Sequence, residues 1–340
     1  MREWFKKRAA GTESARMTPD PGRRDAGARE RIDPERLEVR RGAFAIVGDL
    51  QPTSGLEIWR ESNPRERRAI LREVSEENPD FVAFLGDLVF CGSSSAAWDE
   101  FDRLCSPLKA AGISAYPVLG NHEYWLSRRP ALANYFARFP HLRERHWYAA
   151  TYGSLGLVFL DSNLRWLPPA AWREQLAWFR RRLEQWDADD AISGTLVLLH
   201  HPPFTNSRVT SDTIHVQRDF VPPFVQSAKT LAMVSGHVHN YERYVRDGKT
   251  FLVAGGGGGP RAALREGGRR RHTDDLFEGG RIRAFHYLRF RPGTDALEVE
   301  VRGLEKDGTG FDTMERFELR GTAPTAPTVP TAPSAPPALR

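Results

Sequence analysis

Short apolar runs that stop abruptly at polar residues are the feature of this sequence that most constrains its fold. The runs Ala43–Val47 and Phe81–Leu85 both lead into Gly-Asp, and Ile113–Leu119 leads into Gly-Asn-His. Two later runs, Thr195–Leu199 and Leu231–Val234, lead into His-His and Ser-Gly-His. Continuous apolar runs of this length are typical of strands in a sheet that is covered on both faces. We therefore expect buried strands whose carboxyl ends carry polar side chains.

Amphipathic helices separate these runs. The segments Pro64–Glu77, Trp98–Ala111 and Pro169–Trp186 place apolar residues at steps of three and four, which is the period of one helix face. Strands that alternate with helices predict a mainly parallel α/β layer fold, in which ligands bind beyond the carboxyl ends of the strands. From about Ala284 onward, an alternating pattern with Pro-Gly and Asp-Gly turns predicts β-hairpins.

The net charge of +5 over 340 residues lies at the ends of the chain. Residues 1–43 carry a net charge of +4 and residues 321–340 carry +1, so residues 44–320 are neutral overall. We expect residues 1–43 to be a disordered basic segment, 44–320 to be one folded domain, and 321–340 to be a disordered Pro/Ala/Thr-rich tail. A neutral domain gives no strong sign of nucleic-acid binding.

The cysteine content and the hydropathy of the sequence indicate in which cellular compartment the protein resides. The two cysteines, Cys91 and Cys105, fit no zinc pattern, and two free thiols are the expected state in a reducing compartment. No stretch approaches the roughly 20 apolar residues that a membrane helix needs, and no apolar signal-peptide core follows the basic N-terminal residues. We expect a cytoplasmic protein without membrane contact, although secretion stays open if the start site is misassigned. The oligomeric state stays open.

The polar residues at the strand ends have the composition of a metal site. Carboxylates, amides and imidazoles form an oxygen and nitrogen donor set without thiolate, which suits Mn, Fe, Zn or Co. An unpaired aspartate at the end of a buried strand is costly, and a bound cation removes that cost. The candidate ligands are Asp49, Gln51, Asp87, Asn121, His200, His237 and His239.

The order of these blocks resembles the calcineurin-like metallophosphoesterase superfamily. The blocks are Asp-x-Gln at residue 49, Gly-Asp at 86, Gly-Asn-His-Glu at 120, His at 200 and Gly-His-x-His at 236. The last block continues as Asn-Tyr-Glu-Arg, which is most similar to the purple acid phosphatase branch. The resemblance covers roughly residues 43–260. It implies a four-layer α/β/β/α sandwich with a dimetal site at the carboxyl ends of the strands, and it makes residues 44–320 the catalytic domain.

Carried over residue by residue, the resemblance implies two metal ions. Asp87 would bridge both metals, Asp49 and His239 would hold the first, and the second would be held by Asn121, His200 and His237. His200 is preferred over His201 because it matches the family's Val-x-x-His block. If strand alternation continues beyond Leu199, the two histidines face opposite sides, so that only one of them is a ligand.

Two positions depart from the family pattern. Gln51 stands where most of the superfamily has histidine, and an amide oxygen is a weaker ligand than an imidazole. The first metal would therefore be loosely held, or Gln51 would act through water. Phe90 stands where purple acid phosphatases have a metal-binding tyrosine. Without that hydroxyl, the coloured iron–tyrosinate centre is not expected.

The resemblance implies a hydrolase of phosphate esters, with a phosphomonoesterase as the first choice. A hydroxide that bridges two metal ions would attack phosphorus, and His122 would stabilise charge or protonate the leaving group. A phosphodiesterase or nuclease on the same dimetal site is the first alternative. A non-catalytic binding module on a degenerate scaffold is the second, and the Gln51 departure is its only support.

Neighbours of these blocks carry further expectations. Glu123 would orient His122 or pair with a basic residue. The run Gly255–Gly259 predicts a close backbone approach beneath the metal site. Glu242 and Arg243 would form a structural ion pair beside the site.

Overall fold

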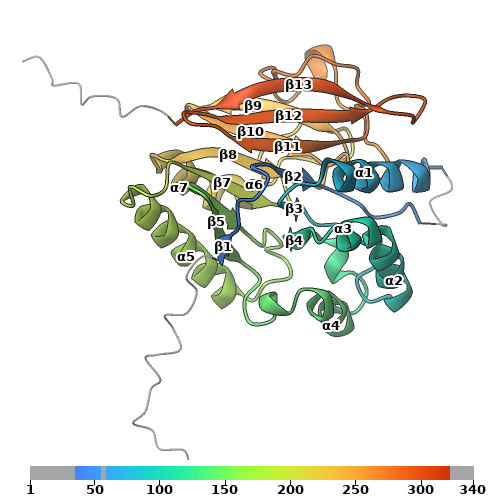
Figure 1. Cartoon of the computed structure of the whole chain (residues 1–340), viewed down its shortest axis with the longest axis horizontal. Coiled ribbons are helices and arrows are strands. Elements are labelled where there is room, and N and C mark those ends of the chain that lie inside the picture. The colour runs from blue at the N-terminus through green and yellow to red at the C-terminus, as the bar shows by residue number, and fades with distance from the viewer. Residues whose placement is uncertain (1–34, 55–58, 322–340) are drawn as a thin grey trace, which may run out of the picture. The chain divides into compact units, whose positions relative to one another are not determined.

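Two β-sheets form the centre of the computed structural model, which describes residues 35–54 and 59–321 (Figure 1). The first sheet has seven strands and the second has six. In spatial order the first sheet contains β1 (Glu35–Leu37), β5 (Tyr148–Tyr152), β6 (Leu155–Phe159), β7 (Gly194–Leu199), β8 (Thr230–Ser235), β10 (Lys249–Ala254) and β9 (Tyr241–Arg246). The second contains β13 (Phe311–Leu319), β12 (Leu297–Leu304), β11 (His286–Pro292), β2 (Phe44–Val47), β3 (Phe81–Phe84) and β4 (Ser114–Pro117).

Within each sheet, the strands that carry the site motifs run parallel to one another. In the second sheet β2 pairs with β3 and β3 with β4, all in parallel. In the first sheet β7 pairs in parallel with β8, which pairs in parallel with β10. The predicted C-terminal hairpins are present as β11, β12 and β13, which pair antiparallel. Parallel strands bring their carboxyl ends to one edge of a sheet, which is where the predicted site residues stand.

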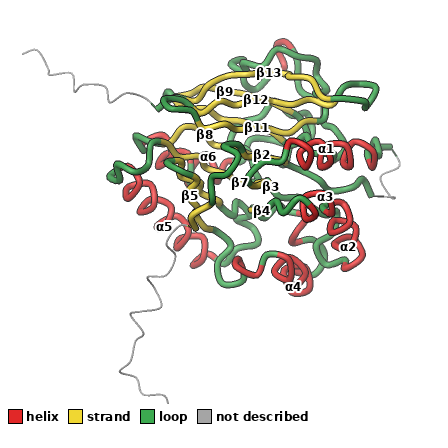
Figure 2. The backbone as a smooth tube through the Cα atoms, in the orientation of Figure 1, coloured by secondary structure: helices red, strands yellow, loops and turns green. Residues whose placement is uncertain are grey.

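Helices cover the outer faces of the two sheets. Figure 2 shows the strands lying together, with helices outside them. The helices are α1 (Pro64–Glu77), α2 (Ser95–Leu104), α3 (Ser106–Ala110), α4 (Arg128–Arg138), α5 (Pro169–Asp187), α6 (Ile214–Asp219) and α7 (Val221–Gln226). In Figure 1, α1 to α4 lie near β2, β3 and β4, whereas α5 and α7 lie beside the other sheet.

Side-chain alternation along β7 explains the layers. Leu196 and Leu198 belong to the apolar cluster that includes both sheets, whereas Val197 and Leu199 belong to a second cluster with helix α5. Aromatic contacts join the sheets directly, since the ring of Tyr152 in β5 meets that of Phe44 in β2 edge-on at 5.5 Å between centroids. Strands covered on both faces must be apolar throughout, as the sequence predicted. The predicted arrangement of two sheets between helices is confirmed.

Element boundaries differ from the predictions where proline or long-range pairing decides them. Helix α1 spans the predicted residues, but the segment predicted as one helix over Trp98–Ala111 is two helices, α2 and α3, with a break at Cys105. Pro107 follows this break, and proline fits the first turn of a helix but not its interior. Strand β1 pairs in parallel with β5.

The described residues cover only part of the two chain ends that were predicted to be disordered. The segment predicted to be disordered, residues 1–43, includes strand β1, so this prediction is wrong for residues 35–37. The rest of the basic segment up to residue 34, and the tail from residue 322, lie outside the described residues. Among the helices of the described chain, none has both the length and the apolar content to cross a membrane.

Candidate metal centre

A glycine precedes four of the five predicted ligand blocks, all but that of His200, because the site loops approach one another too closely for a side chain. A Cβ atom on Gly86 would lie 2.5 Å from the backbone nitrogen of Gly120. One on Gly120 would lie 2.2 Å from Asp87 Oδ1, and one on Gly236 would lie 2.5 Å from Asp49 Oδ2. Real Cβ atoms do not approach other atoms this closely. The glycines of the Gly-Asp, Gly-Asn-His and Gly-His blocks therefore allow the site to assemble.

Three candidate ligands have strained backbone conformations. Asp49, Asp87 and His237 have positive φ angles of 59°, 52° and 67°. Residues other than glycine rarely adopt this region, and such strain gathers at functional sites. Each of the three residues follows the end of a strand, β2, β3 or β8.

In the second predicted metal set, the candidate ligand atoms of three residues lie close to one ring nitrogen of His200. His200 Nε2 lies 3.2 Å from Asn121 Oδ1, 3.1 Å from His237 Nδ1 and 3.3 Å from Asp87 Oδ2. With metal–ligand distances of about 2.1 Å, neighbouring donors around one ion stand about 3.0–3.4 Å apart. The three distances from His200 Nε2 therefore match those between neighbouring ligands of one metal ion.

The first predicted metal set is also close, although less regular. His239 Nε2 lies 3.5 Å from Asp49 Oδ1 and 3.0 Å from the side-chain nitrogen of Gln51. That amide group is also 3.3 Å from Asp87 Oδ2, whereas the buried oxygen Gln51 Oε1 has no hydrogen-bond partner among the described residues. A rotation of the amide by 180° would exchange the two atoms and direct the oxygen toward this set. Gln51 is thus placed where an amide-oxygen ligand would stand.

Backbone carbonyls fix the tautomers of two candidate ligands. His200 Nδ1 lies 2.7 Å from the carbonyl oxygen of Leu85, and His239 Nδ1 lies 2.8 Å from that of Pro260. Because a carbonyl only accepts, each Nδ1 carries the proton and each neutral ring presents its Nε2 lone pair to the site. Lone pairs then face the carboxylates of Asp87 and Asp49, and a bound cation, or a proton on the ring when no metal is bound, offsets this repulsion. The residues present fit the metal ions that the sequence predicted.

The pKa values of the candidate ligands also indicate that the site requires positive charge. Burial disfavours a charged His200, but the neighbouring Asp87 carboxylate outweighs burial and raises the pKa of His200 to about 9. Burial and the charge of His200 lower the pKa of His237 to about 3. Burial also raises the pKa of Asp49. A proton on His200 supplies the positive charge that the carboxylates demand when no metal ion is bound.

His122 lies beside the metal sets and is held from two sides. Its Nδ1 donates to the carbonyl oxygen of Phe90 at 2.6 Å, and its ring stacks on Trp125 with 3.7 Å between the centroids. Its Nε2 lies 3.9 Å from Asp87 Oδ2. These contacts leave Nε2 as the nitrogen that can exchange a proton with a molecule bound at the site.

Glu123 does not perform either of its predicted roles. Its buried carboxylate accepts hydrogen bonds from three backbone nitrogens, those of Asp87 at 2.9 Å, Leu88 at 2.7 Å and Gly120 at 2.6 Å. It therefore neither orients the His122 ring nor pairs with a basic residue. Instead, it joins the loop after β3 to the loop after β4, and these two loops carry Asp87 and Asn121.

The glycine run after β10 passes directly beneath the first metal set, as predicted. Gly257 donates its backbone N–H to the carbonyl oxygen of Gly48 at 2.7 Å, and Gly259 donates to that of Asp49 at 2.8 Å. A Cβ on Gly257 would lie 2.1 Å from the Gly48 oxygen. The run therefore supports the turn that carries Asp49.

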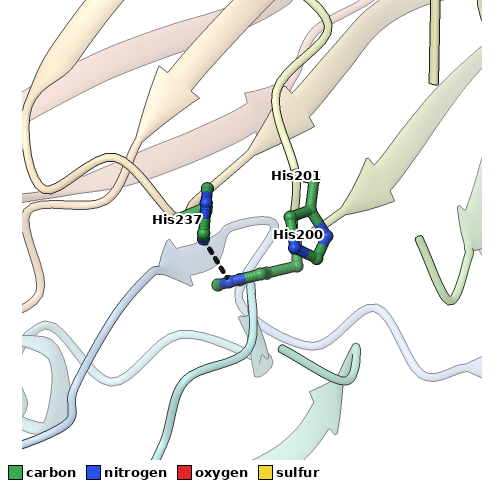
Figure 3. Close-up of side chains that lie close together, drawn as sticks. All are labelled: His200, His201 and His237. Atoms are coloured by element: carbon green, nitrogen blue, oxygen red, sulfur yellow. Dashed lines mark hydrogen bonds between the residues drawn. The ribbon is translucent and has the colours of Figure 1, made fainter. Parts of the chain in front are cut away.

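His201 does not face away from His200, because the strand alternation on which that expectation depended ends before these residues. Figure 3 shows the rings of His200, His201 and His237 together, with one ring nitrogen of His201 directed toward His237. The three residues can offer ligand atoms within 4.8 Å of one another. Strand β7 ends at Leu199, so the alternation of strand side chains no longer applies at residues 200 and 201.

The predicted ion pair between Glu242 and Arg243 is absent. Glu242 accepts hydrogen bonds from Thr205 Oγ1 at 2.5 Å and from the backbone nitrogen of Asn206 at 2.6 Å. Arg243 instead binds Glu315 at 2.6 Å. Neighbours in a β-strand point to opposite faces, which separates the two side chains. Glu242 thereby anchors the loop that follows His200 and His201.

Comparisons with known proteins identify the family. The family model described as calcineurin-like phosphoesterase matches residues 42–241. The chain is 26% identical over 212 residues to Purple acid phosphatase 22 of Arabidopsis thaliana, which covers 60% of this chain and 45% of that protein. It is also 26% identical over 191 residues to a probable cyclic nucleotide phosphodiesterase of Synechococcus, covering 54% of this chain and 67% of that protein.

A solved structure supports the same fold. A dimetal phosphatase from Danio rerio aligns with a TM-score of 0.56 at 16% identity, covering 82% of this chain and 99% of that one. The chain spans about half the length of the plant phosphatases that it matches. Because the family model matches more than half of the sequence, the chain belongs to the calcineurin-like phosphoesterase family. The family predicted from the order of the motifs is confirmed.

Proposed function

We propose that the chain hydrolyses phosphate monoesters with two metal ions held by the residues described above. Asp87 would contact both ions, Asp49, Gln51 and His239 would complete the first set, and the second set would add Asn121, His200 and His237. One observation carries the proposal. The Nε2 atoms of His200 and His239 lie beside the carboxylates of Asp87 and Asp49, and the carbonyls of Leu85 and Pro260 hold the ring protons on Nδ1. When bound, such a metal pair supplies a water-derived nucleophile at neutral pH and neutralises phosphate oxygens.

His122 is the proposed proton donor to the leaving group. Its Nδ1 proton is committed to the Phe90 carbonyl, so Nε2 is the ring nitrogen from which a proton would pass to the leaving group. Stacking on Trp125 holds the ring in this orientation, so the proton is presented from a fixed position.

An assay with two model esters tests the proposal. Purified protein loaded with Mn, Fe, Zn or Co is expected to hydrolyse p-nitrophenyl phosphate faster than bis(p-nitrophenyl) phosphate. The same protein treated with chelator is expected to lose this activity and to regain it when metal is restored. A protein that binds metal and hydrolyses neither ester would refute the proposal and favour a binding module.

Phosphodiester hydrolysis is the second candidate function. It is supported by the similarity to the probable cyclic nucleotide phosphodiesterase of Synechococcus. The same metal sets would serve both reactions, so a faster rate with the bis-ester would decide for this candidate. The family membership supports metal-dependent phosphoester hydrolysis in either case.

A further inference from the structure

His201 has a hydrogen-bonding environment unlike that of the candidate metal ligands beside it. Its Nδ1 lies 2.8 Å from the hydroxyl oxygen of Ser162, and its own backbone N–H donates to the same oxygen at 3.0 Å. Ser162 is fully buried and follows the end of strand β6. The backbone carbonyl of Ser162 in turn accepts a hydrogen bond from His215 Nε2 at 2.8 Å, which fixes the loop.

This environment selects one tautomer of His201. Because Ser162 Oγ already accepts the backbone N–H of His201, its own buried proton needs an acceptor, and His201 Nδ1 is the acceptor that lies in reach. The ring proton of neutral His201 then sits on Nε2. His200 and His239 have the opposite tautomer, since carbonyl oxygens hold the proton on their Nδ1.

The ring of His201 lies against the rings of two candidate ligands of the second metal set. Its ring centroid lies 4.5 Å from that of His237 and 4.8 Å from that of His200. Figure 3 draws one hydrogen bond among the three rings, and it joins His200 to His237. A ring that carries its proton on Nε2 offers no lone pair there, so His201 is suited to donate a hydrogen bond and not to bind metal.

We infer that His201 is a substrate-contacting residue, whose Nε2–H donates to a phosphate oxygen bound beside the second metal set, and that Ser162 is the positioning residue that fixes this tautomer. The inference rests on the proposed function and adds a neutral donor to it. His201 thereby differs from His122, which transfers a proton, because His201 only donates a hydrogen bond to an oxygen that stays on phosphorus.

Binding of inorganic phosphate to the metal-loaded full chain tests this inference. His201→Phe is expected to keep the metal content of the wild type, measured by mass spectrometry of the metals. Its dissociation constant for phosphate, measured by calorimetry, is expected to rise about tenfold or more, which is the loss of one hydrogen bond to a charged acceptor. His201→Gln places an amide N–H near the Nε2 position and should recover most of the affinity. His141→Phe, the same substitution at an exposed site, should change neither quantity.

Ser162→Ala provides an independent test that leaves the imidazole in place. It is expected to weaken phosphate binding several-fold with unchanged metal content, because the tautomer of His201 is no longer fixed. A loss of metal in His201→Phe would make His201 a ligand and overturn the inference. Intact metal with unchanged phosphate affinity in His201→Phe would also overturn it. If the wild type binds metal but not phosphate, the proposed function itself fails.

Discussion

Replacement of Glu123 by glutamine tests how the two central loops of the site are held together. The carboxylate accepts three buried backbone N–H groups at 2.6–2.9 Å. If the amide oxygen takes the place of Oε2, the N–H groups of Asp87 and Gly120 keep an acceptor and that of Leu88 faces an NH2 group. A buried N–H without an acceptor costs about 1–3 kcal/mol, and the two remaining bonds lose the charge that strengthens them. Burial and the charge of Asp87 raise the pKa of Glu123 to about 7, so the carboxyl is fully ionised only at a higher pH. At about pH 9, Glu123→Gln should therefore lower the free energy of unfolding by about 1–3 kcal/mol.

Urea unfolding of the metal-free protein measures this loss. The urea concentration at the midpoint of unfolding should fall. The slope of the unfolding free energy against urea concentration should change little, because the surface exposed on unfolding is the same as before. Glu144→Gln is the matched control, since Glu144 is exposed and the substitution should change stability by less than about 0.5 kcal/mol. A loss below about 0.5 kcal/mol in Glu123→Gln would show that the carboxylate does not join the loops, and the reasoning would be refuted.

Three further predictions concern catalysis, packing and pH. His122→Ala should retain both metal ions but lose about 10²–10⁴-fold in kcat, and full activity in metal-loaded protein would exclude its role as proton donor. Gly257→Ala should lower the melting temperature, because its Cβ would lie 2.1 Å from the Gly48 carbonyl oxygen, whereas Gly268→Ala has open space and should match the wild type. The Glu300 carboxyl is buried, which opposes its ionisation, but hydrogen bonds from a threonine and two arginines outweigh burial and lower its pKa to about 2 from 4.5. The ionised carboxylate therefore stabilises the fold fully above about pH 4.5, and this stabilisation is lost as the pH falls toward 2. The free energy of unfolding of Glu300→Gln should fall less steeply than that of the wild type between about pH 4.5 and 2. An equally steep fall in both proteins would contradict this.

Elements with a strong local pattern could be predicted from the sequence. Strands such as β7 and helices such as α1 and α5 have periodic apolar residues that report burial on one or both faces. Strand β5, with the sequence YAATY, was missed because alanine and threonine give little apolar signal. Its position depends on pairing with β1 and β6, which a local pattern does not reveal.

The convergence of the candidate ligands could be predicted because parallel strands bring their carboxyl ends together. The arrangement of groups around them could not. The opposite facing of His200 and His201 was expected only if strand alternation continued past Leu199, and β7 ends at that residue. The role of Glu123 was missed because its partners are backbone nitrogens, which every residue but proline offers and no motif marks.

The number of metal ions bound per chain tests the central claim most directly. Protein freed of metal, then titrated with Mn or Zn and separated from excess ions, should contain two ions per chain by mass spectrometry. Asp87→Asn removes the carboxylate that lies between both sets and should lose both ions. One ion or none in the wild type, or two ions retained in Asp87→Asn, would contradict the account.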